Sequence, residues 1–129
     1  FQILENASNA LKPKNSKLIF TTLNGLFPLF HSVKDFLESE KKEGTAEYSE
    51  NKFDLMTFRE HNVTTVVDDD GEKKEITCNE RYYIPSELTW MLKSLGFTSI
   101  DIFGAKLGAF SRDNRLTTED FEMLIIAEK

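Results

Sequence analysis

The segment Met123–Ala127 (MLIIA) most constrains the fold of this chain, because it is an uninterrupted apolar run between polar flanks. It is short for a buried helix, and two adjacent Ile residues favour a strand. A strand that is apolar at every position is covered on both faces, so it lies in the interior of a sheet. The chain offers two neighbours for it, Lys17–Leu23 (KLIFTTL) and Thr98–Gly104 (TSIDIFG).

The length, composition and net charge of the chain limit its domain organisation and its partners. The 129 residues, of which 40% are hydrophobic and 11 are Phe, predict a single domain over residues 1–129 with an aromatic-rich core. A net charge of −6 argues against nucleic acid or an anionic membrane surface as a partner. The one cysteine, Cys78, forms no internal disulfide, which is typical of a cytoplasmic protein. No apolar run has the length of a membrane span.

The rest of the sequence predicts helices packed on this sheet and one long hairpin. Apolar residues at helical spacing mark the helices, and the acidic turn Asp68–Gly71 marks the hairpin. We expect helices at Phe1–Leu11, Leu26–Glu43 and Pro85–Leu95, the hairpin at residues 53–84, and loops at Thr45–Lys52 and Ala105–Leu116. This order of elements predicts an α/β fold.

No complete catalytic or metal-binding motif is present, and both histidines are isolated. Topology therefore guides the search, because ligands of open α/β sheets bind beyond the carboxyl ends of parallel strands. Lys17–Leu23 leads into Asn24, and Thr98–Gly104 leads into the loop that contains Arg112. We expect a site at that edge, completed by side chains of the hairpin. For any one of these residues alone, a packing or surface role is commoner.

Three segments follow one another in an informative order: Leu4–Phe20 (LENASNALKPKNSKLIF), Tyr83–Phe103 (YIPSELTWMLKSLGFTSIDIF) and Phe121–Lys129 (FEMLIIAEK). Together they resemble the carboxyl half of a class I S-adenosylmethionine-dependent methyltransferase. The first is similar to the family's helix, LKPGG turn and strand five, the second to its TPEEL segment, helix and strand six, and the third to strand seven. Lys14-Asn15 departs from the family's glycine pair. The hairpin resembles the insertion of small-molecule methyltransferases.

The resemblance implies a partial Rossmann-like sheet in which strand seven lies antiparallel between strands five and six, with flanking helices and an inserted hairpin. It also implies a parent enzyme that uses S-adenosylmethionine and methylates a small molecule. Methyl transfer needs alignment of the acceptor rather than a fixed catalytic motif. The substrate-binding residues that we expect are Asn24, His31, Arg59, Tyr82, Tyr83 and Arg112.

The family's glycine-rich cofactor loop and its ribose-binding acidic residue precede the point where Phe1 stands. We therefore expect this chain to be a carboxyl-terminal part that needs the missing N-terminal half, binds the cofactor poorly and is inactive alone. Without the preceding strands, Lys17–Leu23 is a bare sheet edge, which predicts a homodimer. Two alternatives remain: a non-catalytic binding or dimerisation module with this half-fold, and a different α/β enzyme completed by a partner chain.

Overall fold

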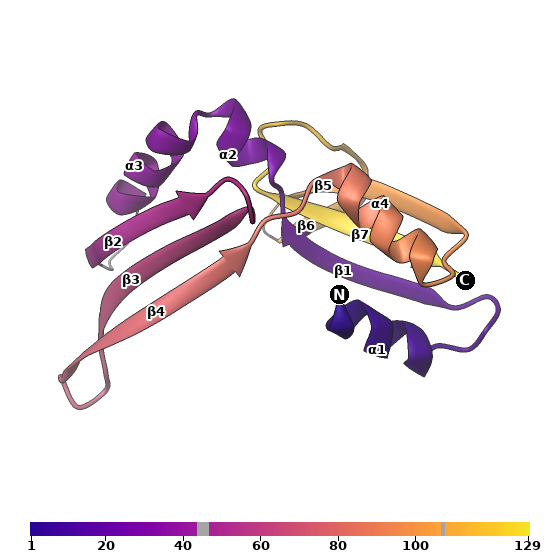
Figure 1. Cartoon of the computed structure of the whole chain (residues 1–129), viewed down its shortest axis with the longest axis horizontal. Coiled ribbons are helices and arrows are strands. Elements are labelled where there is room, and N and C mark those ends of the chain that lie inside the picture. Colours follow the sequence, from indigo (N-terminus) through magenta and orange to yellow (C-terminus); the bar gives the residue numbers. More distant parts are fainter. Residues whose placement is uncertain (44–46, 107) are drawn as a thin grey trace. The chain divides into compact units, whose positions relative to one another are not determined.

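The computed structural model describes residues 1–43, 47–106 and 108–129 (Figure 1). The chain divides into two compact units: one combines Phe1–Phe27 with Tyr83–Lys129, and the other is Pro28–Tyr82. The division falls within the short helix α2 (Leu26–Phe30). The first unit contains the predicted sheet, and the second contains most of the predicted insertion. None of the helices in the described ranges is long and apolar enough to cross a membrane.

The first unit is a four-stranded sheet with two helices. Its elements are α1 (Gln2–Ala10), β1 (Lys17–Leu23), α4 (Pro85–Ser94), β5 (Ser99–Lys106), β6 (Ala109–Arg115) and β7 (Glu122–Glu128). The strand order is β1-β7-β5-β6, and all neighbouring strands are antiparallel. β1 and β5 are therefore parallel to each other with β7 between them. This confirms the predicted arrangement of strands five, seven and six.

The side chains of β7 divide between the two faces of this sheet. Met123, Ile125 and Ala127 belong to the main core, which also receives side chains from α1 and α4. Leu124 and Ile126 form a smaller buried cluster on the opposite face. Each fully buried Ile, Leu or Met side chain contributes roughly 1.5–3 kcal/mol. The apolar run is thus the central strand that the sequence predicts.

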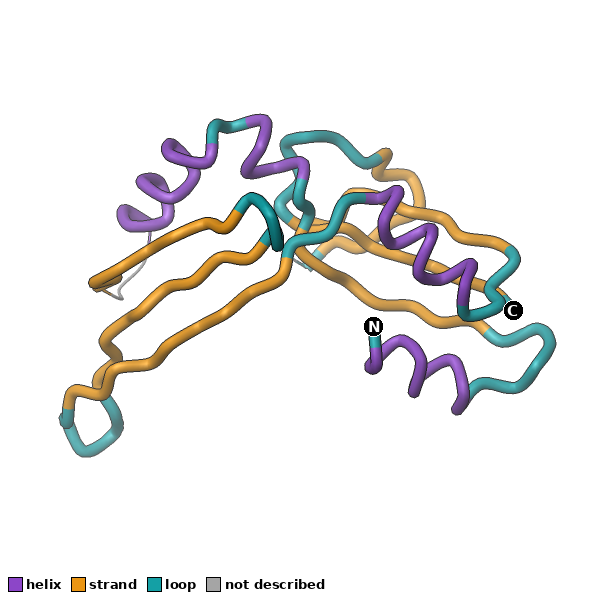
Figure 2. The backbone as a smooth tube through the Cα atoms, in the orientation of Figure 1, coloured by secondary structure: helices purple, strands orange, loops and turns teal. Residues whose placement is uncertain are grey.

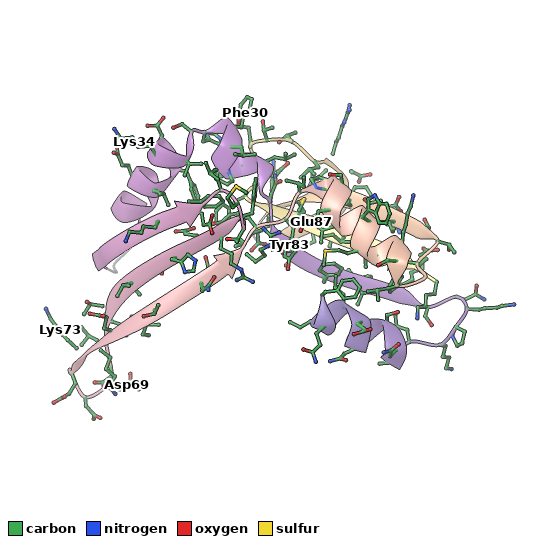
Figure 3. All side chains as sticks on the ribbon, in the orientation of Figure 1. Phe30, Lys34, Asp69, Lys73, Tyr83 and Glu87 are labelled. Carbon is green, nitrogen blue, oxygen red and sulfur yellow. The ribbon has the colours of Figure 1, made fainter. Side chains whose placement is uncertain are left out.

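The second unit consists of α3 (Val33–Glu43) and the strands β2 (Glu47–Asp54), β3 (Arg59–Val67) and β4 (Lys73–Arg81). The three strands form an antiparallel sheet in chain order, and α3 lies against β2 (Figure 2). The predicted turn joins β3 to β4, and the Asp68 amide donates to the Glu72 carbonyl oxygen at 2.9 Å. Asp69 and Lys73 lie at this tip and point outward (Figure 3).

Two segments that were expected to be loops contain strands. Of Thr45–Lys52, residues 45 and 46 lie outside the described part, and Glu47 begins β2. The segment Ala105–Leu116 contains β6, which pairs with β5. Both strands are polar, so their side chains show no strand pattern, and pairing with a neighbouring backbone determines the structure. The predicted hairpin is formed by β3 and β4, and β2 adds a third strand to it.

The predicted helix Leu26–Glu43 is two helices. Ser32 adopts a left-handed φ of 59° between α2 and α3, and its carbonyl oxygen accepts a hydrogen bond from the amide of Phe36 at 2.9 Å. The predicted end at Gly44 lies outside the described residues. Apolar residues keep helical spacing across the break, so their periodicity does not reveal it.

Candidate functional site

Asn24 lies directly after β1 and is completely buried. Its side-chain amide donates to the carbonyl oxygens of Asp120 (2.7 Å) and Thr117 (3.3 Å), and its side-chain oxygen accepts from the Leu26 amide (3.1 Å). Asn suits this position because one side chain both donates and accepts. The contacts tie the end of β1 to the segment before β7, so Asn24 positions the carboxyl edge of the sheet. Its direct contact with a substrate remains a prediction.

Asp120 is the second buried polar residue at this edge, with 8% of its surface exposed. Its Oδ2 accepts hydrogen bonds from the Thr117 amide (2.7 Å) and the Thr117 hydroxyl (2.9 Å). A Cβ atom on Gly104 of β5 would lie 2.5 Å from the same oxygen, so the close approach requires glycine. Sequence reasoning missed Asp120, although a Thr three residues before an Asp is a local signal for such a turn.

Tyr83 reaches this edge from the segment before α4. Its amide donates to the Leu23 carbonyl oxygen (3.1 Å), and its own carbonyl oxygen accepts from the Gly25 amide (2.8 Å). These bonds form a parallel bridge between Tyr83 and Asn24. The structure thus brings together two of the six predicted site residues at the carboxyl end of β1.

Arg112 lies on β6 and lines a hollow of about 500 Å³ on the sheet face that carries Leu124 and Ile126. The hollow is largely apolar, and its β1 wall includes Ile19, which is 59% exposed. Arg112 also lies near the charge of Glu128. A hydrogen bond and ion pair with Lys17 lower the pKa of the Glu128 carboxyl, and the positive charge of Arg112 contributes to the shift. Arg112 therefore belongs to the open sheet face, apart from the Asn24 edge.

Tyr82 is central to the aromatic cluster of the second unit. It is completely buried, and its ring centroid lies 5.5 Å from that of Phe53 and 5.8 Å from that of Phe36. Its hydroxyl donates to Oε2 of Glu60 at 2.9 Å. Glu60 is also completely buried. Sequence reasoning missed Glu60, because a charged residue in an alternating strand is normally exposed.

His31 and Arg59 also belong to the second unit. The His31 ring makes an edge contact with Phe30, with centroids 5.9 Å apart. Nη1 of Arg59 donates to Oδ1 of Asn79 across the β3–β4 pair at 2.9 Å. The six predicted residues are thus divided: His31, Arg59 and Tyr82 lie in the second unit, and the other three lie in the first.

Glu60 and Glu80 are cross-strand partners on β3 and β4. Partial burial raises the pKa of Glu80, and the negative charge of Glu60 raises it further. The two carboxyl groups create a region of negative potential on one face of this sheet.

A search of solved structures finds methyltransferases. The CcbJ methyltransferase from Streptomyces caelestis matches with a TM-score of 0.60 at 14% identity, over 97% of this chain and 47% of that chain. An S-adenosylmethionine-dependent methyltransferase from Clostridium acetobutylicum matches with a TM-score of 0.63 at 13% identity, over 97% of this chain and 48% of that chain. The chain has the fold of the carboxyl-terminal half of a methyltransferase.

The chain thus spans about half the length of these two structures. No protein-family model matches the sequence, and no curated protein matches it. The likeness therefore rests on the arrangement of the backbone, and at this level of identity it establishes the fold.

The two glycines at the carboxyl edge of the sheet are Gly25 and Gly104. Dinucleotide and related cofactors are held by glycine-rich turns after a strand, where backbone amides approach the ligand. Here the Gly25 amide is bonded to the Tyr83 carbonyl oxygen, and Gly104 faces the Asp120 carboxyl group. Both glycines at the carboxyl edge are used in internal packing.

Proposed function

We propose that this chain forms the substrate-side half of an S-adenosylmethionine-dependent methyltransferase that acts on a small molecule. The observation that carries the proposal is the position of β7, antiparallel between β1 and β5, in a chain that aligns over 97% of its length with half of two methyltransferases. The cofactor, which supplies an activated methyl group when bound, is held by residues outside this chain. The chain alone is inactive.

In this proposal the chain aligns the acceptor and excludes water. Methyl transfer is an in-line displacement, and alignment of the two reacting atoms lowers its barrier. Asn24 and Asp120 hold the carboxyl edge of the sheet in one conformation through buried hydrogen bonds. The direct contacts proposed for the acceptor are those of Asn24 and Tyr83, which form a parallel bridge at the end of β1.

The test is cofactor binding by the protein that the complete open reading frame encodes. We expect that protein to bind S-adenosylmethionine with a Kd at least a hundredfold lower than the present chain does, measured by calorimetry. S-adenosylhomocysteine should compete for the same site. Equal binding by both proteins, or binding by neither, would contradict the proposal.

A second candidate is a dimerisation module, and the edge strand β1 favours it. β1 has β7 as its neighbour on one side in the sheet order, and Ile19 on this strand is 59% exposed. Exposed apolar edge strands pair readily with other chains. We propose that β1 pairs with β1 of a second copy, and this contact is compatible with either function.

A further inference from the structure

The face of β3 that points into the second unit is polar. Glu60, Asn62 and Thr64 occupy alternate positions on this strand, and their exposed fractions are 0%, 6% and 9%. A strand with one covered face normally places apolar side chains there. Three consecutive polar residues at such positions therefore call for a functional explanation.

These buried side chains retain unused hydrogen-bonding atoms. Oε1 of Glu60, Oδ1 of Asn62 and Oγ1 of Thr64 have no hydrogen-bond partner within the described structure. Asn51 lies opposite Asn62 on β2, and its side-chain oxygen and nitrogen also have no hydrogen-bond partner. A buried polar atom without a partner costs about 1–3 kcal/mol, so a row of them is a strong sign of a binding partner.

The unused atoms indicate the chemistry of that partner. Oε1 of Glu60 and Oδ1 of Asn62 are acceptors, so the ligand must donate hydrogen bonds. None of the ion pairs found among the described residues involves Glu60, and its register partner on β4 is Glu80, another acidic residue. The only bonded oxygen of Glu60 accepts from the neutral Tyr82 hydroxyl. None of the described side chains supplies a cation to this buried carboxyl group.

The described side chains of α3 and β2 that surround the Glu60–Tyr82 pair are aromatic. Phe53 of β2 is the register partner of Glu60, and Phe36 of α3 contacts both Phe53 and Tyr82, with centroid distances of 6.4 and 5.8 Å. Lys34 on α3 is directed elsewhere, because its side chain is 80% exposed and lies 3.9 Å from Glu38. Aromatic rings beside a carboxylate attract organic cations through the ring quadrupole. Among the described residues, no group of three or more His, Cys, Asp and Glu side chains is arranged to hold a metal ion.

We propose that this face of the second unit binds an organic ammonium group. The ammonium N–H groups donate to Oε1 of Glu60 and to Oδ1 of Asn62, and the rings of Phe36, Phe53 and Tyr82 surround the attached carbon atoms. Glu80, the register partner of Glu60 on β4, is exposed, and in this proposal the ligand enters from that side. Binding requires neither S-adenosylmethionine nor methyl transfer, so it holds or fails independently of the proposed function.

The test compares two probes of equal size, benzylammonium and benzyl alcohol, by NMR titration of the whole chain. We expect benzylammonium to shift the amide resonances of β3 in a saturable manner, and benzyl alcohol to bind at least tenfold more weakly. Equal affinity for both probes, or no saturable shift with benzylammonium, would overturn the proposal.

Two single-residue variants test whether the Glu60 side chain binds the ammonium group. Glu60→Gln keeps the size of the side chain and removes its charge, so it should weaken benzylammonium binding at least tenfold. Glu75→Gln is the matched control, because Glu75 is an exposed residue of β4 with the same charge, and this variant should bind as the parent does. Unchanged binding by Glu60→Gln would refute the assignment. If that variant unfolds, the comparison of the two probes on the parent chain still decides.

Discussion

The contact between Gly104 and Asp120 provides a quantitative test of how the carboxyl edge of the sheet is built. A Cβ atom on Gly104 would lie 2.5 Å from Oδ2, 2.7 Å from Cγ and 2.8 Å from Oδ1 of Asp120. All three atoms belong to one carboxyl group. Gly104 lies within β5, where an alanine has no backbone strain. The Gly104→Ala substitution therefore tests a single steric contact.

The expected loss of stability comes from the hydrogen bonds that the Asp120 carboxyl group loses when it moves. To make room it has to move by about 1 Å, which breaks or lengthens its bonds to the amide and hydroxyl of Thr117. Hydrogen bonds to a charged group contribute about 1.5–3 kcal/mol each, and overpacking typically costs about 1–3 kcal/mol. Since the turn relaxes in part, we expect Gly104→Ala to lower the free energy of unfolding by about 2–4 kcal/mol, measured by urea denaturation.

A double-mutant cycle isolates this contact. Asp120→Ala removes all three clashing atoms, so Gly104→Ala in that background should cost less than about 0.5 kcal/mol, or stabilise slightly by restricting the unfolded chain. A coupling energy of at least about 1.5 kcal/mol is expected between the two substitutions. The reasoning is refuted if Gly104→Ala costs the same in both backgrounds, or if it costs nothing in the parent chain.

Three further predictions address other parts of the molecule. The folded state raises the pKa of Glu80 above its ordinary value of 4.5, so ionisation of Glu80 opposes folding once the pH exceeds that value. Glu80→Gln should therefore stabilise the fold at pH 7 by up to about 1 kcal/mol, the upper limit for an exposed charge. At pH 3 the substitution should leave the free energy of unfolding unchanged. Equal effects at both pH values would count against this prediction. Asn24→Ala removes one buried and two partly buried hydrogen bonds, so it should lower the free energy of unfolding by about 2–4 kcal/mol in thermal or urea denaturation. A loss below about 0.5 kcal/mol would show that other contacts hold the edge. Ile19→Lys places a charge on edge strand β1 and should weaken self-association at least tenfold in light-scattering measurements; a parent chain that is monomeric at high concentration would disprove the β1 contact.

The sequence by itself determined the elements whose signals are local. The run Met123–Ala127 required a central strand, because its side chains are apolar on both faces. The turn Asp68–Gly71 set the register of β3 and β4, and Pro85 and Gly96 bounded α4, where Gly96 has a φ of 86°. In each case a few neighbouring residues fix the backbone, so no distant part of the chain is needed.

The tertiary structure decided what depends on distant neighbours. β2 and β6 have polar sequences and become strands because a backbone ladder is available beside them. Glu60 becomes buried because α3 and β2 place Phe36 and Phe53 around Tyr82, to which it is bonded. Asp120 becomes part of the edge because β5 brings Gly104 against it. The pattern of apolar and polar side chains along a segment indicates which residues prefer to be buried. The chain topology decides which neighbours each residue meets. Glu60 and Asp120 are polar residues whose burial is explained only by those neighbours.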